Sequence, residues 1–282
     1  MNQDAPYRGA IHVIRGNRWP VLMSVPHAGR DYDSELIARS RLGQAALEKL
    51  EDPLVDRLIA GALTLGVGAV IANAPRAAID CNRAEDELDP RAIAGRTGVA
   101  PTARARAGLG LIPTRLAEVG DLWRAPISEA TFNSRLAEIH RAFHDAIDAE
   151  LAALSRLWRD VVLIDCHSMP PRPPGEADVV IGDRHGTSSA PWVTEAAVEI
   201  AQRLGFKVAR NIPFAGGHIV ERHGKPSRGR HAVQIEVDRS RYCLRDARSP
   251  RPGFERVSHL FDALARELGE LTSGRRWPDA AE

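Results

Sequence analysis

Cysteine is scarce in this sequence, and the three that occur, Cys81, Cys166 and Cys243, lie far apart along the chain. An odd number of cysteines without a Cys-x-x-Cys pair provides neither a disulfide framework nor a cysteine-based metal or redox motif. This usage is typical of a reducing compartment, so we expect a cytoplasmic protein.

Long apolar runs are also missing. No stretch approaches the roughly 18 consecutive apolar residues that a membrane-spanning helix needs. The first nine residues are polar and lack the apolar segment of a signal peptide. The sequence therefore predicts neither a membrane span nor export.

Net charge is close to zero, and aromatic residues are few. The chain of 282 residues has 38 Lys and Arg against 37 Asp and Glu, so no overall field indicates a nucleic-acid-binding protein. Nucleic-acid binding by the arginine-rich segment 91–124 is only an alternative. Hydrophobic residues make up 44% of the chain and aromatic residues 5%, which predicts a largely aliphatic core.

Short apolar runs alternate with helical patterns along the chain. Strands are predicted at 10–14, 21–25, 69–72, 161–169, 177–183, 205–209 and 231–238. Helices are predicted at 53–65, 128–158, 191–204 and 254–271. The alternation favours one α/β domain over residues 1–282, an α/β sandwich with a mostly parallel sheet.

Local signals add detail to this prediction. The first two strands are separated by a short turn, so we expect them to pair with each other. Asp52 followed by Pro53 is typical of an N-cap and first helical residue, so the helix 53–65 is expected to start there. Segment 91–123 has little periodicity and is interpreted as an extended excursion or lid, and 273–282 as a frayed tail.

Two histidines come at the ends of buried strands. Strand 161–169 reads Val-Val-Leu-Ile-Asp-Cys-His-Ser-Met, and strand 21–25 continues into Pro26-His27-Ala-Gly. A polar side chain in such a place must be hydrogen-bonded or bound to a metal. His167 and His27 are therefore candidate metal ligands. The alternative for each is a hydrogen-bonded histidine with a structural role.

Further polar residues lie just after or near the end of other predicted strands, namely Asp80, Asn82, Arg83 and Glu236. Sites in α/β sheets form at the carboxyl ends of strands, so we expect these residues to converge. Two histidines with one carboxylate are a typical catalytic zinc site. A glutamate outside the metal ligands provides a general base, and an arginine beside an asparagine suits a substrate carboxylate.

A second pair of histidines, His140 and His144, lies four residues apart in the predicted helix 128–158. That spacing is found in some zinc sites, but the glutamate of the His-Glu-x-x-His motif is missing. We therefore do not expect these two residues to bind the metal.

Five short motifs, in this order, resemble the N-formylglutamate amidohydrolase family over residues 21–242. They are Ser24-Val-Pro-His27-Ala-Gly29, Ile79-Asp80-Cys-Asn82-Arg83, Asp165-Cys-His167-Ser168, Gly216-Gly217-His218-Ile, and His231-Ala-Val-Gln234-Ile-Glu236 with Tyr242 after it. The family is similar in fold to the zinc carboxypeptidases and aspartoacylases. The resemblance thus implies a three-layer α/β/α sandwich with a mixed sheet. It also implies an enzyme that hydrolyses the linear amide C–N bond of N-formyl-L-glutamate, in histidine degradation.

The resemblance also implies roles for individual residues. One zinc ion is expected on His27, an acidic residue and His167, with Glu236 as general base. Asn82 and Arg83, assisted by Arg76, are expected to hold substrate carboxylates. Asp165 and Gln234 are expected to support these groups, Asp165 by orienting a ligand histidine.

The chain departs from the related patterns at two places. Arg30 stands three residues after His27, where carboxypeptidases have the glutamate ligand, so the carboxylate must come from elsewhere. Asp52 is the favoured candidate and Asp56 the alternative, although an N-cap role would also explain Asp52. The second departure is in residues 216–224, whose sequence differs from that of better-known members of the family. We expect this segment, His218 included, to contact the substrate.

The expected partner is thus a small N-acyl amino acid, with no nucleic-acid or membrane partner. Three alternatives remain on sequence alone: a deacylase of another N-acyl amino acid, a carboxypeptidase-type zinc hydrolase, and a carboxylate-binding protein without catalysis. The sequence does not indicate an oligomeric state.

Overall fold

The computed structural model describes residues 9–98 and 100–274, which form two compact units. The first unit consists of Pro26–Glu51, Ile71–Asp145 and the described residues up to His12. The second consists of Val13–Val25, Asp52–Val70 and the described residues from Ala146 onward. Most of the sheet and the helices that cover it belong to the second unit.

Seven strands form one sheet in the order β1-β3-β2-β6-β9-β7-β8. Their bounds are β1 Ile11–Ile14, β2 Val21–Val25, β3 Gly68–Ala72, β6 Val161–Met169, β7 Val179–Gly182, β8 Val208–Arg210 and β9 Arg230–Asp238. Strand β6 runs parallel to β2 and β9, whereas β7 is antiparallel to β9 and parallel to β8. The sheet is therefore mixed and mostly parallel, which confirms the predicted fold class.

The expected pairing of the first two strands is wrong. Strand β3 lies between β1 and β2, so the short turn after Ile14 does not close a hairpin. The partner of a strand depends on residues far along the chain, and a local turn signal contains no information about such an insertion.

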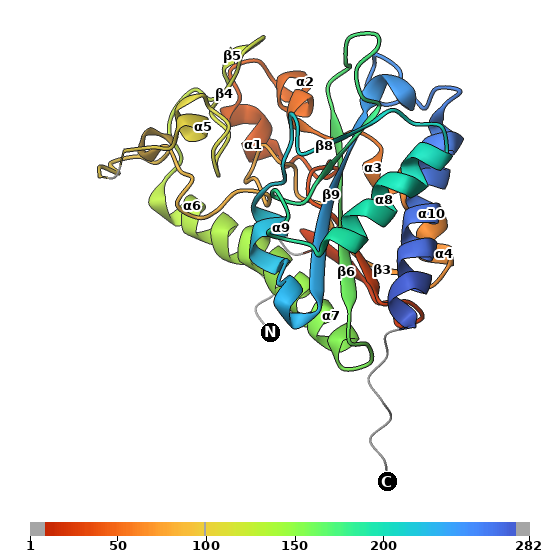
Figure 1. The fold of residues 1–282 in the computed structure, drawn as a ribbon. Coiled ribbons are helices and arrows are strands. Elements are labelled where there is room, and N and C mark those ends of the chain that lie inside the picture. Colours follow the sequence, from red (N-terminus) through yellow and green to blue (C-terminus); the bar gives the residue numbers. More distant parts are fainter. Residues whose placement is uncertain (1–8, 99, 275–282) are drawn as a thin grey trace. The chain divides into compact units, whose positions relative to one another are not determined.

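Helices cover both faces of the sheet in the second unit, as a three-layer fold requires (Figure 1). One side has α3 (Val55–Leu58), α4 (Ala60–Thr64), α8 (Pro191–Arg203) and α10 (Phe254–Ser273). Helix α10 contacts the other three helices and strands β2 and β6. The short helix α9 (His218–His223) contacts β6 and β9 on the opposite side. All nine residues of β6 are buried between these layers.

The helix predicted at 53–65 is two short helices, α3 and α4. Leu54 adopts a left-handed backbone conformation with φ of 63°, and α3 begins only at Val55. No side chain caps α3, so the N-cap role considered for Asp52 is wrong. The apolar side chains predicted to face inward are nevertheless all buried: Leu54, Val55, Leu58, Ile59 and Ala62.

The first unit has shorter elements and less regular structure. Its elements are α1 (Ser34–Arg39), α2 (Gln44–Leu47), η1 (Glu48–Leu50), η2 (Pro90–Ala92), α5 (Ala103–Arg106), and the paired strands β4 (Arg115–Leu116) and β5 (Gly120–Asp121). Within the segment predicted to be an excursion or lid, Leu111, Ile112 and Leu122 are fully buried. This segment therefore contributes core residues to its unit, and closure over a site stays a prediction.

A long helical segment follows, made of α6 (Glu129–Arg135), η3 (Leu136–Arg141) and α7 (Ala142–Ser155). The predicted start is confirmed, because the hydroxyl of Ser128 accepts the backbone N–H of Thr131 as an N-cap. The segment ends at Ser155, three residues before the predicted end. Its middle, η3, is a π-helical turn, which the periodicity does not predict.

Near the C-terminus, η4 (Pro226–Arg228) precedes β9 and η5 (Arg239–Arg241) follows it. Helix α10 continues to Ser273, and most of the predicted frayed tail lies outside the described residues. Within the described part of the chain, every helix is too short or too polar to span a membrane.

Candidate active site

The register of three parallel strands places polar side chains on one face of the sheet near its carboxyl edge. Ser24 of β2, Asp165 of β6 and Gln234 of β9 are register partners. Two residues further along, His167 lies opposite Glu236. Since side chains of a strand alternate between faces, these five residues share one face. The sheet thus brings a predicted ligand next to the predicted base.

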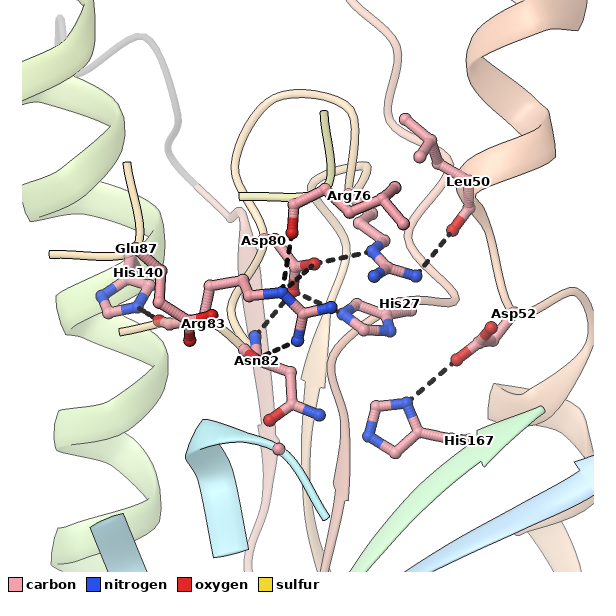
Figure 2. Close-up of polar contacts among 12 residues, drawn as sticks. His27, Leu50, Asp52, Arg76, Asp80, Asn82, Arg83, Glu87, His140 and His167 are labelled. Atoms are coloured by element: carbon pink, nitrogen blue, oxygen red, sulfur yellow. Dashed lines mark hydrogen bonds and ion pairs between the residues drawn. The ribbon is translucent and has the colours of Figure 1, made fainter. Parts of the chain in front are cut away.

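His167 lies between two carboxylates of the second unit. Its Nε2–H donates to Oδ2 of Asp165 at 2.8 Å, and its Nδ1 is 3.0 Å from Oδ2 of Asp52 (Figure 2). Burial opposes a positive charge on the ring, but Asp165 and Asp52 outweigh burial and hold the pKa of His167 well above its ordinary value. Ser24 completes the arrangement by donating its hydroxyl to Oδ1 of Asp165 at 2.7 Å.

Arg239 binds the other carboxylate oxygen of Asp52. Arg239 was not identified as a site residue in the sequence analysis. Nη2 of Arg239 donates to Oδ1 of Asp52 at 2.8 Å, and Nε donates to the hydroxyl of Ser168 at 3.0 Å. Arg239 directly follows the last residue of β9. Its position just after a parallel strand is the signal that could have identified it.

Glu236 is positioned by Gln234, two residues earlier on the same face of β9. The side-chain amide of Gln234 donates to Oε1 of Glu236 at 2.9 Å, and its carbonyl oxygen accepts the backbone N–H of Gly217 at 2.7 Å. Gly217 is the N-cap of α9, and His218 is the first residue of that helix. The imidazole of His218 is partly exposed, with Nδ1 4.0 Å from Oε2 of Glu221.

In the first unit, the buried carboxylate of Asp80 connects several predicted site residues (Figure 2). Its Oδ1 accepts Nε2–H of His27 at 2.7 Å and the backbone N–H of Asn82 at 2.8 Å. Its Oδ2 accepts Nε–H of Arg76 at 2.8 Å. Burial alone would raise the pKa of Asp80, but Arg76, His27 and Arg83 outweigh burial and hold it well below the usual range.

Asp80 was part of a recognised motif but had no predicted role. The structure makes it the carboxylate that orients His27, as Asp165 orients His167. The sequence feature that could have indicated this role is its position, two residues before Asn82 and three before Arg83. A buried arginine requires a carboxylate nearby.

Arg83 is nearly buried, with 9% of its surface exposed. Its Nε donates to the carbonyl of Leu109 at 2.9 Å, and its Nη1 donates to the carbonyl of Asn82 at 2.8 Å. Burial lowers the pKa of this guanidinium, while the charge of Asp80 opposes the shift. The group is thus held rigidly by its surroundings.

His27 of the first unit and Asp52 and His167 of the second are each buried and are the candidate ligands for one metal ion. Asp52, and not the alternative Asp56, is the carboxylate in this candidate group. Two imidazoles and one carboxylate are a donor set that zinc accepts, and each histidine has its Nε2 on a carboxylate, as ligand histidines usually do. The residues therefore fit a metal ion.

Comparisons with known proteins identify the family of this chain. The model of the N-formylglutamate amidohydrolase family matches residues 19–243. A curated N-formylglutamate deformylase from Pseudomonas putida is 30% identical over 233 residues, which cover 80% of this chain and 82% of the relative. One from Pseudomonas aeruginosa is 30% identical over 272 residues, covering 91% and 94%.

A solved structure is also similar along nearly the whole chain. The N-formylglutamate amidohydrolase from Ralstonia eutropha JMP134 matches with a TM-score of 0.86 and 26% identity, covering 93% of this chain and 98% of that one. The family match, the two relatives and this structure agree with one another. The chain therefore belongs to the N-formylglutamate amidohydrolase family and is a hydrolase that acts on an amide bond.

Proposed function

We propose that this enzyme is a zinc-dependent deformylase that hydrolyses N-formyl-L-glutamate to formate and glutamate. The observation that carries the proposal is the register of β6 and β9, which places Glu236 directly opposite His167 on the same face of the sheet. A carboxylate next to a metal-ligand candidate, but outside the ligand group, is where hydrolysis requires a general base. The names of the relatives support the choice of substrate.

In this proposal, His27, Asp52 and His167 hold the metal. Bound there, a zinc ion would supply Lewis-acid polarisation and make water acidic enough to lose a proton near neutral pH. Asp80 and Asp165 each fix the Nε2–H of one ligand histidine, so that Nδ1 is the ligating nitrogen. Arg239 holds Asp52 in place.

Glu236 moves the proton. It accepts a proton from the attacking water and delivers that proton to the amide nitrogen as the C–N bond breaks. The hydroxide part of the water adds to the formyl carbon, so the products are formate and an amine. Asn82 and Arg83 bind a carboxylate of the substrate, and His218 contacts the substrate at the start of α9. Arg76, whose Nε–H is bound to Asp80, assists this pair in holding the substrate carboxylate.

The cellular setting follows from the same proposal. Release of glutamate from its N-formyl derivative is the final step expected of a histidine-degradation route. The three cysteines are unbonded and buried, in keeping with the cytoplasmic location expected from the sequence.

Turnover by the purified protein tests the proposal. We would measure metal content and compare kcat/KM for N-formyl-L-glutamate, N-acetyl-L-glutamate, N-formyl-L-aspartate and a dipeptide. We expect one zinc per chain and a clear preference for N-formyl-L-glutamate. Equal or faster turnover of an acetyl or dipeptide substrate would assign another deacylase or a carboxypeptidase-type activity.

A variant at the base provides the matched control. Glu236→Gln keeps the shape of the side chain but cannot take a proton, so kcat should fall by about 100-fold or more while zinc remains bound. Unchanged activity in this variant would exclude Glu236 as the base. Tight binding of the substrate without turnover by the zinc-loaded wild type would indicate a carboxylate-binding protein.

A further inference from the structure

The π-helical turn η3 lies in the middle of the long helical segment and belongs to the first unit. Such turns are rare and are found frequently at functional sites. Neither proline nor glycine occurs between Glu129 and Ser155 to account for the irregularity. The turn therefore requires an explanation from what its side chains contact.

Two side chains at this turn hold the segment that carries Asn82 and Arg83. Nη1 of Arg135 donates to the carbonyl of Ala78 at 3.0 Å. Nε2–H of His140 donates to the carbonyl of Arg83 at 2.8 Å (Figure 2). The bonds clamp the segment at its two ends, because Ala78 precedes Asp80 and Arg83 follows it. Both side chains are buried, with 2% of Arg135 and none of His140 exposed.

The spacing of these two donors explains the π-turn. Arg135 and His140 are five residues apart. In an α-helix of 3.6 residues per turn, such residues point about 140° away from each other. In a π-turn the hydrogen bonds join residues five apart, so the fifth residue returns to nearly the same face. The turn is thus what allows both donors to reach one segment of chain.

We propose that Arg135 and His140 are positioning residues that fix the carboxylate-binding pair Asn82 and Arg83. The inference rests on the proposed function, in which this pair binds the substrate. Through these two bonds the donors hold backbone carbonyls, so we expect their effect to reach the substrate through the conformation of residues 78–83. A displacement of about 1 Å in a substrate-holding group is enough to weaken catalysis strongly.

Isosteric variants of His140 test the proposal. Glutamine places its amide nitrogen near the position of Nε2, so His140→Gln keeps the donor to Arg83, whereas His140→Leu removes it. We expect His140→Leu to raise KM for N-formyl-L-glutamate about tenfold with kcat within about threefold of wild type. We expect His140→Gln to stay close to wild type in both constants. Thermal unfolding checks that each variant folds.

Arg135 offers a second pair of variants. Arg135→Lys keeps a cationic donor, and Arg135→Met removes it while retaining most of the side-chain length. The same split between KM and kcat is expected for the methionine variant. If His140→Leu does not fold, His140→Asn, whose amide nitrogen lies near the position of Nδ1, takes its place in the comparison.

A double-mutant cycle with Arg83 distinguishes positioning from general destabilisation. Calorimetry would measure the Kd for N-formyl-L-glutamate in the Glu236→Gln background, so that binding is read without turnover. His140→Leu should raise Kd when Arg83 is present and have no further effect when Arg83→Met is already in place. Additive effects of the two changes would overturn the proposal, as would an unchanged KM in His140→Leu or equal KM values in the glutamine and leucine variants.

The same cycle separates failure of the inference from failure of the proposed function. An unchanged Kd in Arg83→Met would show that Arg83 does not bind the substrate, and the proposed role of the pair would fall together with the inference. A strong effect of Arg83→Met without any effect of His140→Leu or Arg135→Met would leave the function standing and reject the positioning role alone.

Discussion

Arg239 and Asp52 form a direct ion pair, with Nη2 of the arginine 2.8 Å from Oδ1 of the aspartate. The other oxygen, Oδ2, faces Nδ1 of His167 at 3.0 Å. One carboxylate oxygen of Asp52 therefore binds the guanidinium of Arg239, and the other faces the ligand candidate His167. This arrangement orients the carboxylate without using the oxygen that faces the histidine.

Replacement of Arg239 by methionine should weaken metal binding. The variant keeps most of the side-chain length but releases Oδ1 of Asp52, so zinc affinity should fall by about 10- to 100-fold, as is usual when a group supporting a ligand is lost. Competition with a chromogenic chelator measures the change. Arg245→Met, at an exposed arginine six residues later, is the control and should bind zinc like wild type. An unaltered affinity in Arg239→Met would contradict the positioning role.

Asp165→Asn should also lower zinc affinity, because the amide lacks the negative charge that orients and polarises His167. Ser24→Ala removes only one hydrogen bond to the opposite oxygen of Asp165, so its loss should be smaller. Added zinc should restore much of the activity of both variants. A larger loss in Ser24→Ala than in Asp165→Asn would reverse the proposed order of support.

Gln234 should control the activity of Glu236. Gln234→Met removes the donor to Oε1 of Glu236 and the acceptor for Gly217, and kcat should fall about tenfold with KM little changed. Gln234→Glu retains the acceptor for Gly217 but, when ionised, cannot donate to Glu236, so its kcat should fall as well. Gln202→Met, at an exposed position on α8, is the control. Full activity of Gln234→Glu would show that only the bond to Gly217 matters.

Asp183 should make stability depend on acid pH. Burial would raise its pKa, but hydrogen bonds from Asn211 and Gly186 help to outweigh burial and lower the pKa below its ordinary value. The folded state therefore favours the ionised carboxylate, and the stabilisation is present above about pH 4 and is lost as pH falls through the lower folded pKa.

Asp183→Asn tests this dependence. At pH 7 the variant should lose about 1 kcal/mol of the free energy of unfolding, and the difference from wild type should shrink toward pH 3. Urea unfolding at several pH values measures both effects. A difference that stays constant from pH 7 to pH 3 would exclude ionisation of Asp183 as its cause.

The sequence alone determined the elements that build the sheet and the residues they present. The sequence singles out His27, His167 and Glu236 as candidates because each lies just after or near the end of a strand with a clear apolar pattern, and strand ends are where sites form. Strand β6 has the predicted bounds for the same reason. These predictions depend on the local periodicity of apolar residues, which can be read directly from the sequence.

The tertiary structure decided what depends on distant partners. Whether Asp52 caps a helix or joins the metal-binding group turns on Leu54, whose left-handed conformation delays α3, and on Arg239 from the far end of β9. Insertion of β3 between β1 and β2 is likewise a nonlocal event. Asp80 gained its role only when the fold brought His27 and Arg76 to it.

The π-turn shows the same limit within one helix. The apolar pattern from Phe132 to Leu154 predicted a continuous helix, and all the residues of that pattern are buried. The extra residue in the turn changes which backbone groups pair, and Arg135 and His140, five residues apart, both bond to the segment 78–83. Hydrophobic periodicity records which residues are buried, whereas only the folded chain determines which backbone carbonyls their polar atoms meet.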